Sequence, residues 1–220
     1  MKIGKYDIKP ILLYLPDDDF WMKEWKEAQE YLASQGIDDV HEIAGIHYNW
    51  GVCGNKIYLV DGKPEEKFYI GDKKVCGNLS QYLCFSVMNA MDYTHFMFME
   101  GDVKFVDGWR EKLEIEMENV PEDFDFLFAG NCCTMDKEPV HVKGNVYEFP
   151  WRGEAKRFHY PQCSHCLIIA KKCLPFLIAS NRDVSMPSDV SLVVNSFPKL
   201  KVCAILPRIA TQGDKTFLSE

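Results

Sequence analysis

Long apolar runs that alternate with amphipathic segments constrain the fold of this chain more than any other feature. The run 96–99 is continuously apolar, which is typical of a strand buried on both faces. The segment 79–91 instead repeats its apolar residues at helical spacing. We expect strands at 8–15, 40–46, 95–99, 124–129, 166–170 and 200–206, and helices at 21–35, 79–91, 109–120, 171–179 and 189–197. This order predicts an α/β fold with a mostly parallel central sheet covered by helices on both faces.

Composition narrows the class of protein. The chain has 220 residues, 47% of them hydrophobic and 26% charged, which suits a single domain over 1–220. It contains no apolar run of bilayer length and begins without a signal-peptide pattern, so we expect it in the cytoplasm of a bacterium or of a virus-infected host. The net charge of -8 gives no general attraction for nucleic acid or anionic membranes. Any phosphate it binds must therefore be held locally.

The nine cysteines are scattered, odd in number and in several cases set inside apolar runs. This pattern predicts reduced thiols rather than a disulfide framework. An alternative interpretation is a zinc site built on Cys163 and Cys166. A second pair at matching spacing is missing, because Cys132 and Cys133 are adjacent. The sequence thus favours thiols over zinc.

Two carboxylates follow the apolar run 96–99, at Glu100 and Asp102, with Gly101 between them. Ligands of open α/β sheets bind beyond the carboxyl ends of strands. Mg²⁺ and Mn²⁺ prefer oxygen ligands, and such a cation neutralises the charge of a diphosphate leaving group. The pair therefore indicates a metal and sugar-nucleotide site. The alternative is that both side chains cap the turn before the helix at Trp109.

These residues resemble a known group of enzymes. The stretch from Cys76 to Trp109 looks like the core of GT-A glycosyltransferases, especially the lipopolysaccharide-type transferases of glycosyltransferase family 25 and their viral and bacterial relatives. Those enzymes have a Gly-Cys-x-x-Ser-His-like segment, a helix, and a hydrophobic strand that ends in Glu-Asp-Asp-Val. Here Gln81 stands where His is usual, and Gly101 where the first Asp is usual. A weaker likeness extends to 10–15, 187–192 and 207–212.

The resemblance implies a nucleotide-sugar-binding half at 1–105 and an acceptor-binding half at 106–220. It also implies that Asp102 ligates Mn²⁺ or Mg²⁺ and that Glu100 takes over the usual sugar-nucleotide contact as well as a place at the metal. Aromatic and amide groups after the second strand can stack on a nucleobase, although a plain surface loop is an equal reading. The expected contacts with the donor are Tyr14, Gly45, His47, Glu100 and Gly101.

Asp189 is the candidate general base, since transfer with inversion requires a carboxylate to accept the proton of the acceptor hydroxyl. The alternative is that Asp189, or Ser188 beside it, caps the following helix. Candidate acceptor contacts are His165, Trp151 and Arg152, because aromatic rings stack on sugar faces and guanidinium groups bind diphosphate. A solvated loop is the alternative for the last two.

The sequence therefore predicts a glycosyltransferase that moves a sugar from a nucleoside-diphosphate sugar to a hydroxyl acceptor, with inversion implied by the resemblance alone. The acceptor is a glycan or, in the viral alternative, a hydroxymethylated DNA base. A further alternative is an inactive GT-A-like module that binds sugar nucleotides without turnover. The sequence leaves the sugar and the oligomeric state open.

Overall fold

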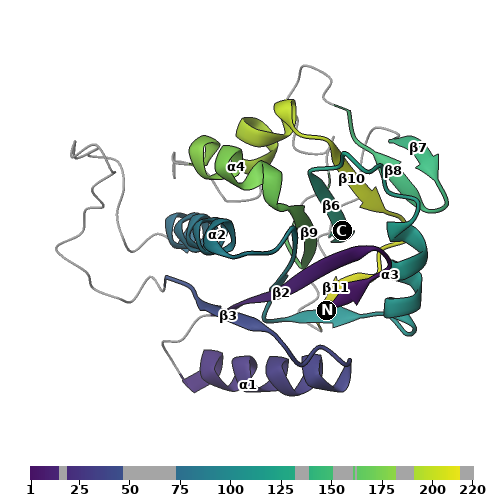
Figure 1. Ribbon diagram of the computed structural model, residues 1–220. Helices are drawn as coiled ribbons and strands as arrows, with labels where there is room; N and C mark the ends of the chain where they lie inside the picture. The colour runs from purple at the N-terminus through teal and green to yellow at the C-terminus, as the bar shows by residue number, and fades with distance from the viewer. Residues whose placement is uncertain are drawn as a thin grey trace, which may run out of the picture.

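The computed structural model describes residues 1–14, 19–46, 73–131, 139–150, 161, 163–181 and 191–213. Its centre is one curled sheet with the path β1-β2-β4-β9-β6-β10-β8-β7, with β3 added beside β2 (Figure 1). The pairs β2–β3, β2–β4 and β6–β10 are parallel, whereas β9 lies antiparallel between β4 and β6. These central strands are β2 (Tyr6–Tyr14), β3 (His41–Ala44), β4 (His95–Glu100), β6 (Phe126–Gly130), β9 (Cys166–Ala170) and β10 (Val202–Ile205). The predicted α/β class with a mostly parallel core is confirmed.

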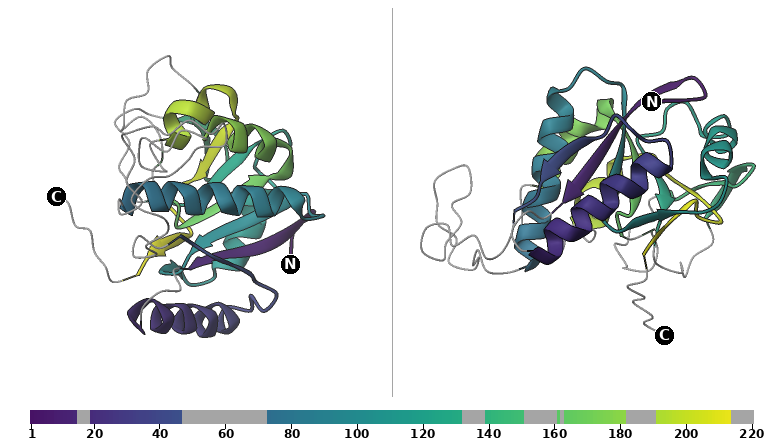
Figure 2. Two further views of the ribbon diagram at one scale, coloured as in Figure 1. Left: turned by 90° about the vertical axis from the view of Figure 1, so that its left-hand side faces the viewer. Right: turned by 90° about the horizontal axis from the view of Figure 1, so that it is seen from below.

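Helices cover the sheet on both faces, as the alternation of strands and helices predicts. In β4, Met97 and Met99 pack in one apolar cluster with residues of α1 and α3, while Phe96 and Phe98 pack in a second cluster with residues of α2 and α4. Figures 1 and 2 show α1 and α2 on opposite sides of the strands. The helices are α1 (Asp19–Ser34), α2 (Lys73–Ala90), α3 (Trp109–Met117) and α4 (Leu174–Ser180). Two-sided burial explains why the apolar run 96–99 is continuous.

Two short strand pairs extend this core. The strand β5 (Val103–Phe105) pairs antiparallel with β11 (Ala210–Gln212), and β11 also touches β6 at Gly130. A Cβ at Gly130 would lie 2.7 Å from the carbonyl oxygen of Ala210, so the close approach of β11 requires glycine. The remaining strands are β1 (Lys2–Ile3), β7 (Val140–Lys143) and β8 (Val146–Glu148).

The expected late helix at 189–197 differs from what the structure shows. Its described part is a π-helix, Leu192–Ser196, followed by the 3₁₀ turn Phe197–Lys199. Pro198 has no backbone N–H, and Ser191 and Ser196 bond to the side chain of Asn181. These side-chain hydrogen bonds and the proline explain why the segment departs from regular α-helical geometry.

The cysteines follow the prediction with one correction. Five described cysteines are buried thiols, and burial raises the pKa of Cys84, Cys166, Cys173 and Cys203 to about 12. Cys163, in contrast, is disulfide-bonded, so the prediction of thiols throughout is wrong there. A cysteine in a disulfide has no thiolate to offer, which also removes Cys163 from the alternative zinc site.

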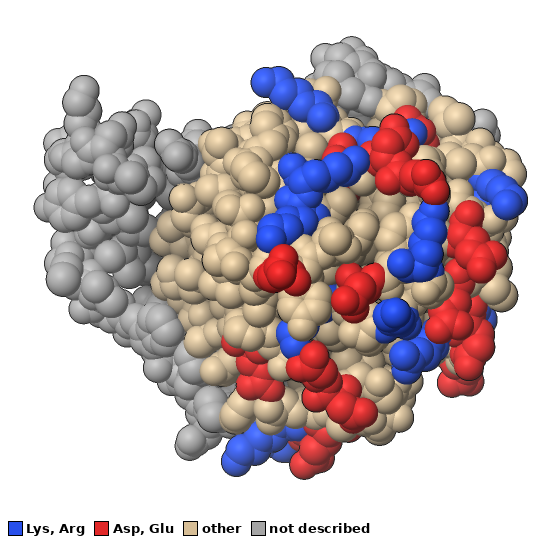
Figure 3. All heavy atoms as spheres, viewed as in Figure 1, with Lys and Arg blue, Asp and Glu red and all other residues tan. Residues whose placement is uncertain are grey.

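The described surface is mixed in charge. Lys and Arg alternate with Asp and Glu over the face shown in Figure 3, and no broad track of one sign crosses the described part of that face. Among the helices that the structure describes, none combines the length and the apolar character needed to cross a bilayer.

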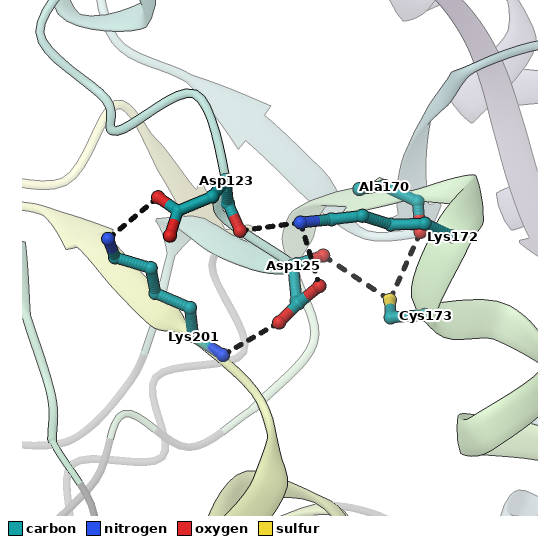
Figure 4. Close-up of polar contacts among 6 residues, drawn as sticks. All are labelled: Asp123, Asp125, Ala170, Lys172, Cys173 and Lys201. Atoms are coloured by element: carbon teal, nitrogen blue, oxygen red, sulfur yellow. Dashed lines mark hydrogen bonds and ion pairs between the residues drawn. The ribbon is translucent and has the colours of Figure 1, made fainter.

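The sheet edge formed by the start of β6 and β10 and the end of β9 is closed by a polar cluster (Figure 4). Asp125 accepts the backbone N–H of Lys201 at 2.8 Å and pairs with the Lys172 ammonium at 3.1 Å. Asp123 accepts from the Lys201 ammonium at 2.7 Å, and the Cys173 thiol donates to the carbonyl oxygens of Ala170 and Asp125. These bonds join three strands, so the cluster stabilises the fold.

Candidate functional site

The opposite edge of the sheet gathers the carboxyl ends of the parallel strands. The register pairs Leu13 with Glu100 across β2 and β4, so these strands end side by side. Because β9 runs antiparallel, its first residue, Cys166, pairs with Met99 of β4 and with Gly130 of β6. The residues just before Cys166 therefore arrive beside Glu100. This register explains how His165, distant in sequence, reaches the acidic pair.

Glu100, Asp102 and His165 form a cluster whose potential ligand atoms all lie within 4.8 Å of one another. The two carboxylates are partly exposed, whereas the imidazole of His165 is buried. The His165 Nδ1 and Glu100 Oε2 atoms are 3.6 Å apart, which is beyond hydrogen-bonding distance. The side chains are thus close without bonding one another.

Two polar atoms of this cluster are buried and have no hydrogen-bond partner among the described residues, namely Asp102 Oδ1 and His165 Nδ1. Leaving a buried polar atom unpaired costs about 1–3 kcal/mol. Carboxylate oxygens suit Mg²⁺ and Mn²⁺, and a ring nitrogen suits a transition metal. The chemistry of the set and its unpaired atoms therefore fit a divalent cation.

The backbone around the acidic pair is fixed by its neighbours. The Gly213 N–H donates to the carbonyl oxygen of Asp102 at 2.8 Å, and the Gln212 amide donates to Asp102 Oδ2 at 2.6 Å. A Cβ at Gly101 would lie 3.8 Å from the carbonyl oxygen of Leu13, an ordinary contact. The fold itself therefore does not demand glycine at position 101.

Tyr14 and Gly45 stand next to each other at the ends of β2 and β3. The Gly45 N–H donates to the carbonyl oxygen of Tyr14 at 2.7 Å. The Tyr14 ring stacks on Trp25, with 5.2 Å between ring centroids. The Ile46 N–H donates to Ser80 Oγ at 2.8 Å, which ties this edge to α2. The structure places both predicted residues at the same sheet edge as the cluster.

Several predicted site residues lie outside the described residues: His47, Trp151, Arg152 and Asp189. Their roles stay predictions. On either side of 182–190 the described chain is joined by polar bonds: Ser191 Oγ donates to Asn181 Oδ1 at 2.7 Å, and Asn181 Nδ2 donates to Ser196 Oγ at 2.9 Å.

Sequence reasoning assigned no role to Asn131 and Gln212, which the structure brings to this edge. Asn131 follows β6, is buried, and has an Nδ2 atom that meets no partner among the described residues, while its backbone oxygen accepts from Arg208 Nη1 at 2.7 Å. Its only signal in the sequence is its place directly after the apolar run of β6. Gln81, which stands where the transferases that the sequence resembles have His, donates to Ser164 Oγ at 3.4 Å and so contacts the segment that carries His165.

Comparisons with known proteins identify the type of fold. No family model and no curated protein matches the chain. Among solved structures, it is similar to a glycosyltransferase involved in the glycosylation of the major capsid of PBCV-1, with a TM-score of 0.52, 10% identity, and coverage of 95% of this chain and 93% of that one. It is also similar to the inositol-1-phosphate CTP transferase from T. maritima, with a TM-score of 0.51, 11% identity, and coverage of 97% and 91%. These likenesses show a GT-A-like fold and give no support to family 25 in particular.

Proposed function

We propose that the chain is a glycosyltransferase that moves a sugar from a nucleoside-diphosphate sugar to a hydroxyl acceptor, with Mn²⁺ or Mg²⁺ held by Glu100, Asp102 and His165. The observation that carries the proposal is this cluster at the carboxyl edge of the parallel strands, with its buried unpaired Asp102 and His165 atoms. Ligands of open α/β sheets bind at that edge.

The ligand set favours Mn²⁺ over Mg²⁺, because it adds an imidazole nitrogen to two carboxylates. When bound, the cation neutralises the negative charge that develops on a diphosphate leaving group. His165 thus serves better as a metal ligand than as the acceptor contact that the sequence predicts. Its ring is buried, with Nδ1 3.6 Å from Glu100 Oε2.

The first half of the chain, 1–105, is proposed to hold the donor. Tyr14 and Gly45 lie beside each other where β2 and β3 end, close in the sheet to Glu100 and Gly101. A nucleoside laid along this edge would run from Tyr14 and Gly45 toward the carboxylates, with His47 as a further contact. Among the described residues, apart from its chain neighbours, the atom nearest to a Cβ added at Gly101 is the Leu13 carbonyl oxygen at 3.8 Å, so a ligand can approach this position closely.

The second half, 106–220, is proposed to supply the acceptor side. Asp189 is the proposed general base of an inverting transfer, taking the proton from the acceptor hydroxyl. Trp151 and Arg152 are proposed acceptor contacts. His165 belongs to this half by sequence yet lies at the metal cluster, so the two halves meet there.

A thermal-shift screen tests the proposal. Nucleoside-diphosphate sugars are added one at a time to the full chain, with Mn²⁺ and with chelator. The proposal expects at least one sugar nucleotide to raise the melting temperature only when Mn²⁺ is present, and the same compound to release nucleoside diphosphate with an acceptor. Binding without release for any glycan or hydroxymethylated DNA acceptor would indicate the inactive module. A shift with nucleoside triphosphates alone would contradict sugar transfer.

A further inference from the structure

Gln212 is the side chain that holds the carboxylate of Asp102. Its Nε2 donates to Asp102 Oδ2 at 2.6 Å, a short bond between residues 110 positions apart in the chain. Gln212 is the last residue of β11 and pairs with Val103, which directly follows Asp102. The next residue, Gly213, holds the Asp102 carbonyl oxygen at 2.8 Å. Both the backbone and the side chain of Asp102 are therefore restrained by β11.

The two oxygens of the Asp102 carboxylate differ in environment. Oδ2 accepts from Gln212, whereas Oδ1 is buried and accepts from no donor in the part of the chain that the structure describes. A free carboxylate rotates about its Cβ–Cγ bond and exchanges its two oxygens. A donor fixed on one oxygen stops that rotation and leaves the other oxygen for a ligand.

The side-chain bond is not needed to join the strands. The pairs Ala210–Phe105 and Thr211–Lys104 already connect β11 to β5, and the Val106 N–H donates to the carbonyl oxygen of Ile209 just beyond the ladder. The amide of Gln212 therefore acts mainly on the orientation of Asp102 rather than on the pairing of the strands.

We infer that Gln212 is a positioning residue, which fixes Asp102 through Oδ2 so that Oδ1 is the oxygen offered to the divalent cation. This inference rests on the cation site of the proposed function. Partners that orient metal ligands typically contribute about 10- to 100-fold to metal affinity. Gln212 lies in β11, apart in sequence from all three proposed ligands, which makes its effect separable from theirs.

The test uses the full chain with Mn²⁺ as the probe. Gln212→Met keeps the length of the side chain and removes its donor, and Gln212→Ala removes both. Thr211→Ala is the matched control, because Thr211 lies on the same strand and its exposed hydroxyl donates to the carbonyl oxygen of Lys104 at 3.4 Å rather than to Asp102. Mn²⁺ affinity is read from the electron paramagnetic resonance signal of free Mn²⁺, and melting temperature is measured in chelator.

The expected result is that both Gln212 variants raise the Kd for Mn²⁺ by about 10-fold or more. The spectrum of bound Mn²⁺ should also change, since the released carboxylate presents its oxygens differently. The Thr211 control should keep parental affinity and spectrum. Parental Kd and spectrum in a folded Gln212→Met protein would overturn this inference and leave the proposed function standing. Absence of Mn²⁺ binding by the parent chain would overturn both.

Discussion

The carboxylates at the two edges of the central sheet lie in opposite environments. At the edge that holds Asp123 and Asp125, each carboxylate meets an ammonium or a backbone N–H (Figure 4). At the other edge, Asp102, His165 and Asn131 each leave a buried polar atom unpaired, and they account for three of the five such atoms among the described residues. Hydrogen-bonded groups stabilise a fold, whereas a buried group without a partner requires a specific explanation, of which a bound ion is one. This difference supports the proposal that the first edge stabilises the fold and the second binds a cation.

The largest expected effect follows from removing a proposed metal ligand at the edge that holds Glu100, Asp102 and His165. Asp102→Asn should raise the Kd for Mn²⁺ by more than about 100-fold, because losing a ligand costs more than losing its orienting partner. The melting temperature in chelator should stay near the parental value, because asparagine has the same size and keeps an oxygen that accepts from Gln212. Titration calorimetry and thermal denaturation measure the two quantities.

Asp107→Asn is the control for this variant, because Asp107 is an exposed carboxylate on the same stretch of chain. It should leave Mn²⁺ affinity unchanged. An Asp102→Asn protein that binds Mn²⁺ like the parent would remove Asp102 from the site and erase the contrast between the two edges.

The next effect concerns the chemical step. Asp189→Asn should lower kcat by about 10²- to 10⁴-fold, because a positioned general base is lost. Asparagine caps a helix as well as aspartate does, so the melting temperature should be kept. Donor affinity should also persist. Steady-state kinetics with the donor found in the screen provides the measurement, and near-parental kcat would mean that Asp189 is only a cap.

At the edge that holds Asp123 and Asp125, we expect a smaller effect, on folding stability instead of Mn²⁺ affinity. Asp125→Ala removes the acceptor of the Lys201 backbone N–H and the partner of the Lys172 ammonium. It should lower the free energy of unfolding by about 1–3 kcal/mol, since a partly buried donor loses its partner. Mn²⁺ affinity should remain parental. Urea denaturation measures the first quantity, and an Asp125 variant that loses Mn²⁺ binding while staying folded would break the division between the edges.

The sequence predicts the elements that carry a strong local pattern. The continuous run 96–99 identifies a strand buried on both faces, and its end marks Glu100 and Asp102 as neighbours at a sheet edge. His165 lies beside Glu100 because β9 pairs antiparallel with β4. Gln212 lies beside Asp102 because β11 pairs with β5. Neither pairing can be predicted from a local pattern in the sequence, because each joins segments that are far apart in the chain.

Two other departures have local causes. The late segment 191–199 has helical spacing in its sequence, yet Pro198 and the Ser191 and Ser196 bonds to Asn181 turn it into π and 3₁₀ turns. The disulfide of Cys163 could not be predicted from composition, because an odd number of scattered cysteines indicates thiols on average and says nothing of one pair that folding brings together.

The smallest expected effect is a pH dependence at the edge that holds Asp123 and Asp125. The hydrogen bond from the Lys201 ammonium lowers the pKa of Asp123 below its usual value of 3.8. A lowered pKa in the folded state means that Asp123 stabilises the fold above pH 3.8 and that this contribution disappears as the pH falls through the folded-state pKa. Asp123→Asn should therefore melt slightly below the parent at neutral pH, and the gap should close in acid. A gap that widens in acid would contradict the assignment.

The most direct test of the central claim is anomalous X-ray diffraction at the manganese edge from crystals of the full chain grown with Mn²⁺. The account predicts one strong anomalous peak per chain, bounded by the side chains of Glu100, Asp102 and His165, with Asp102 Oδ1 as the bound oxygen and Oδ2 still accepting from Gln212. A protein without a peak there, or with its only peak at the edge that holds Asp123 and Asp125, would contradict it.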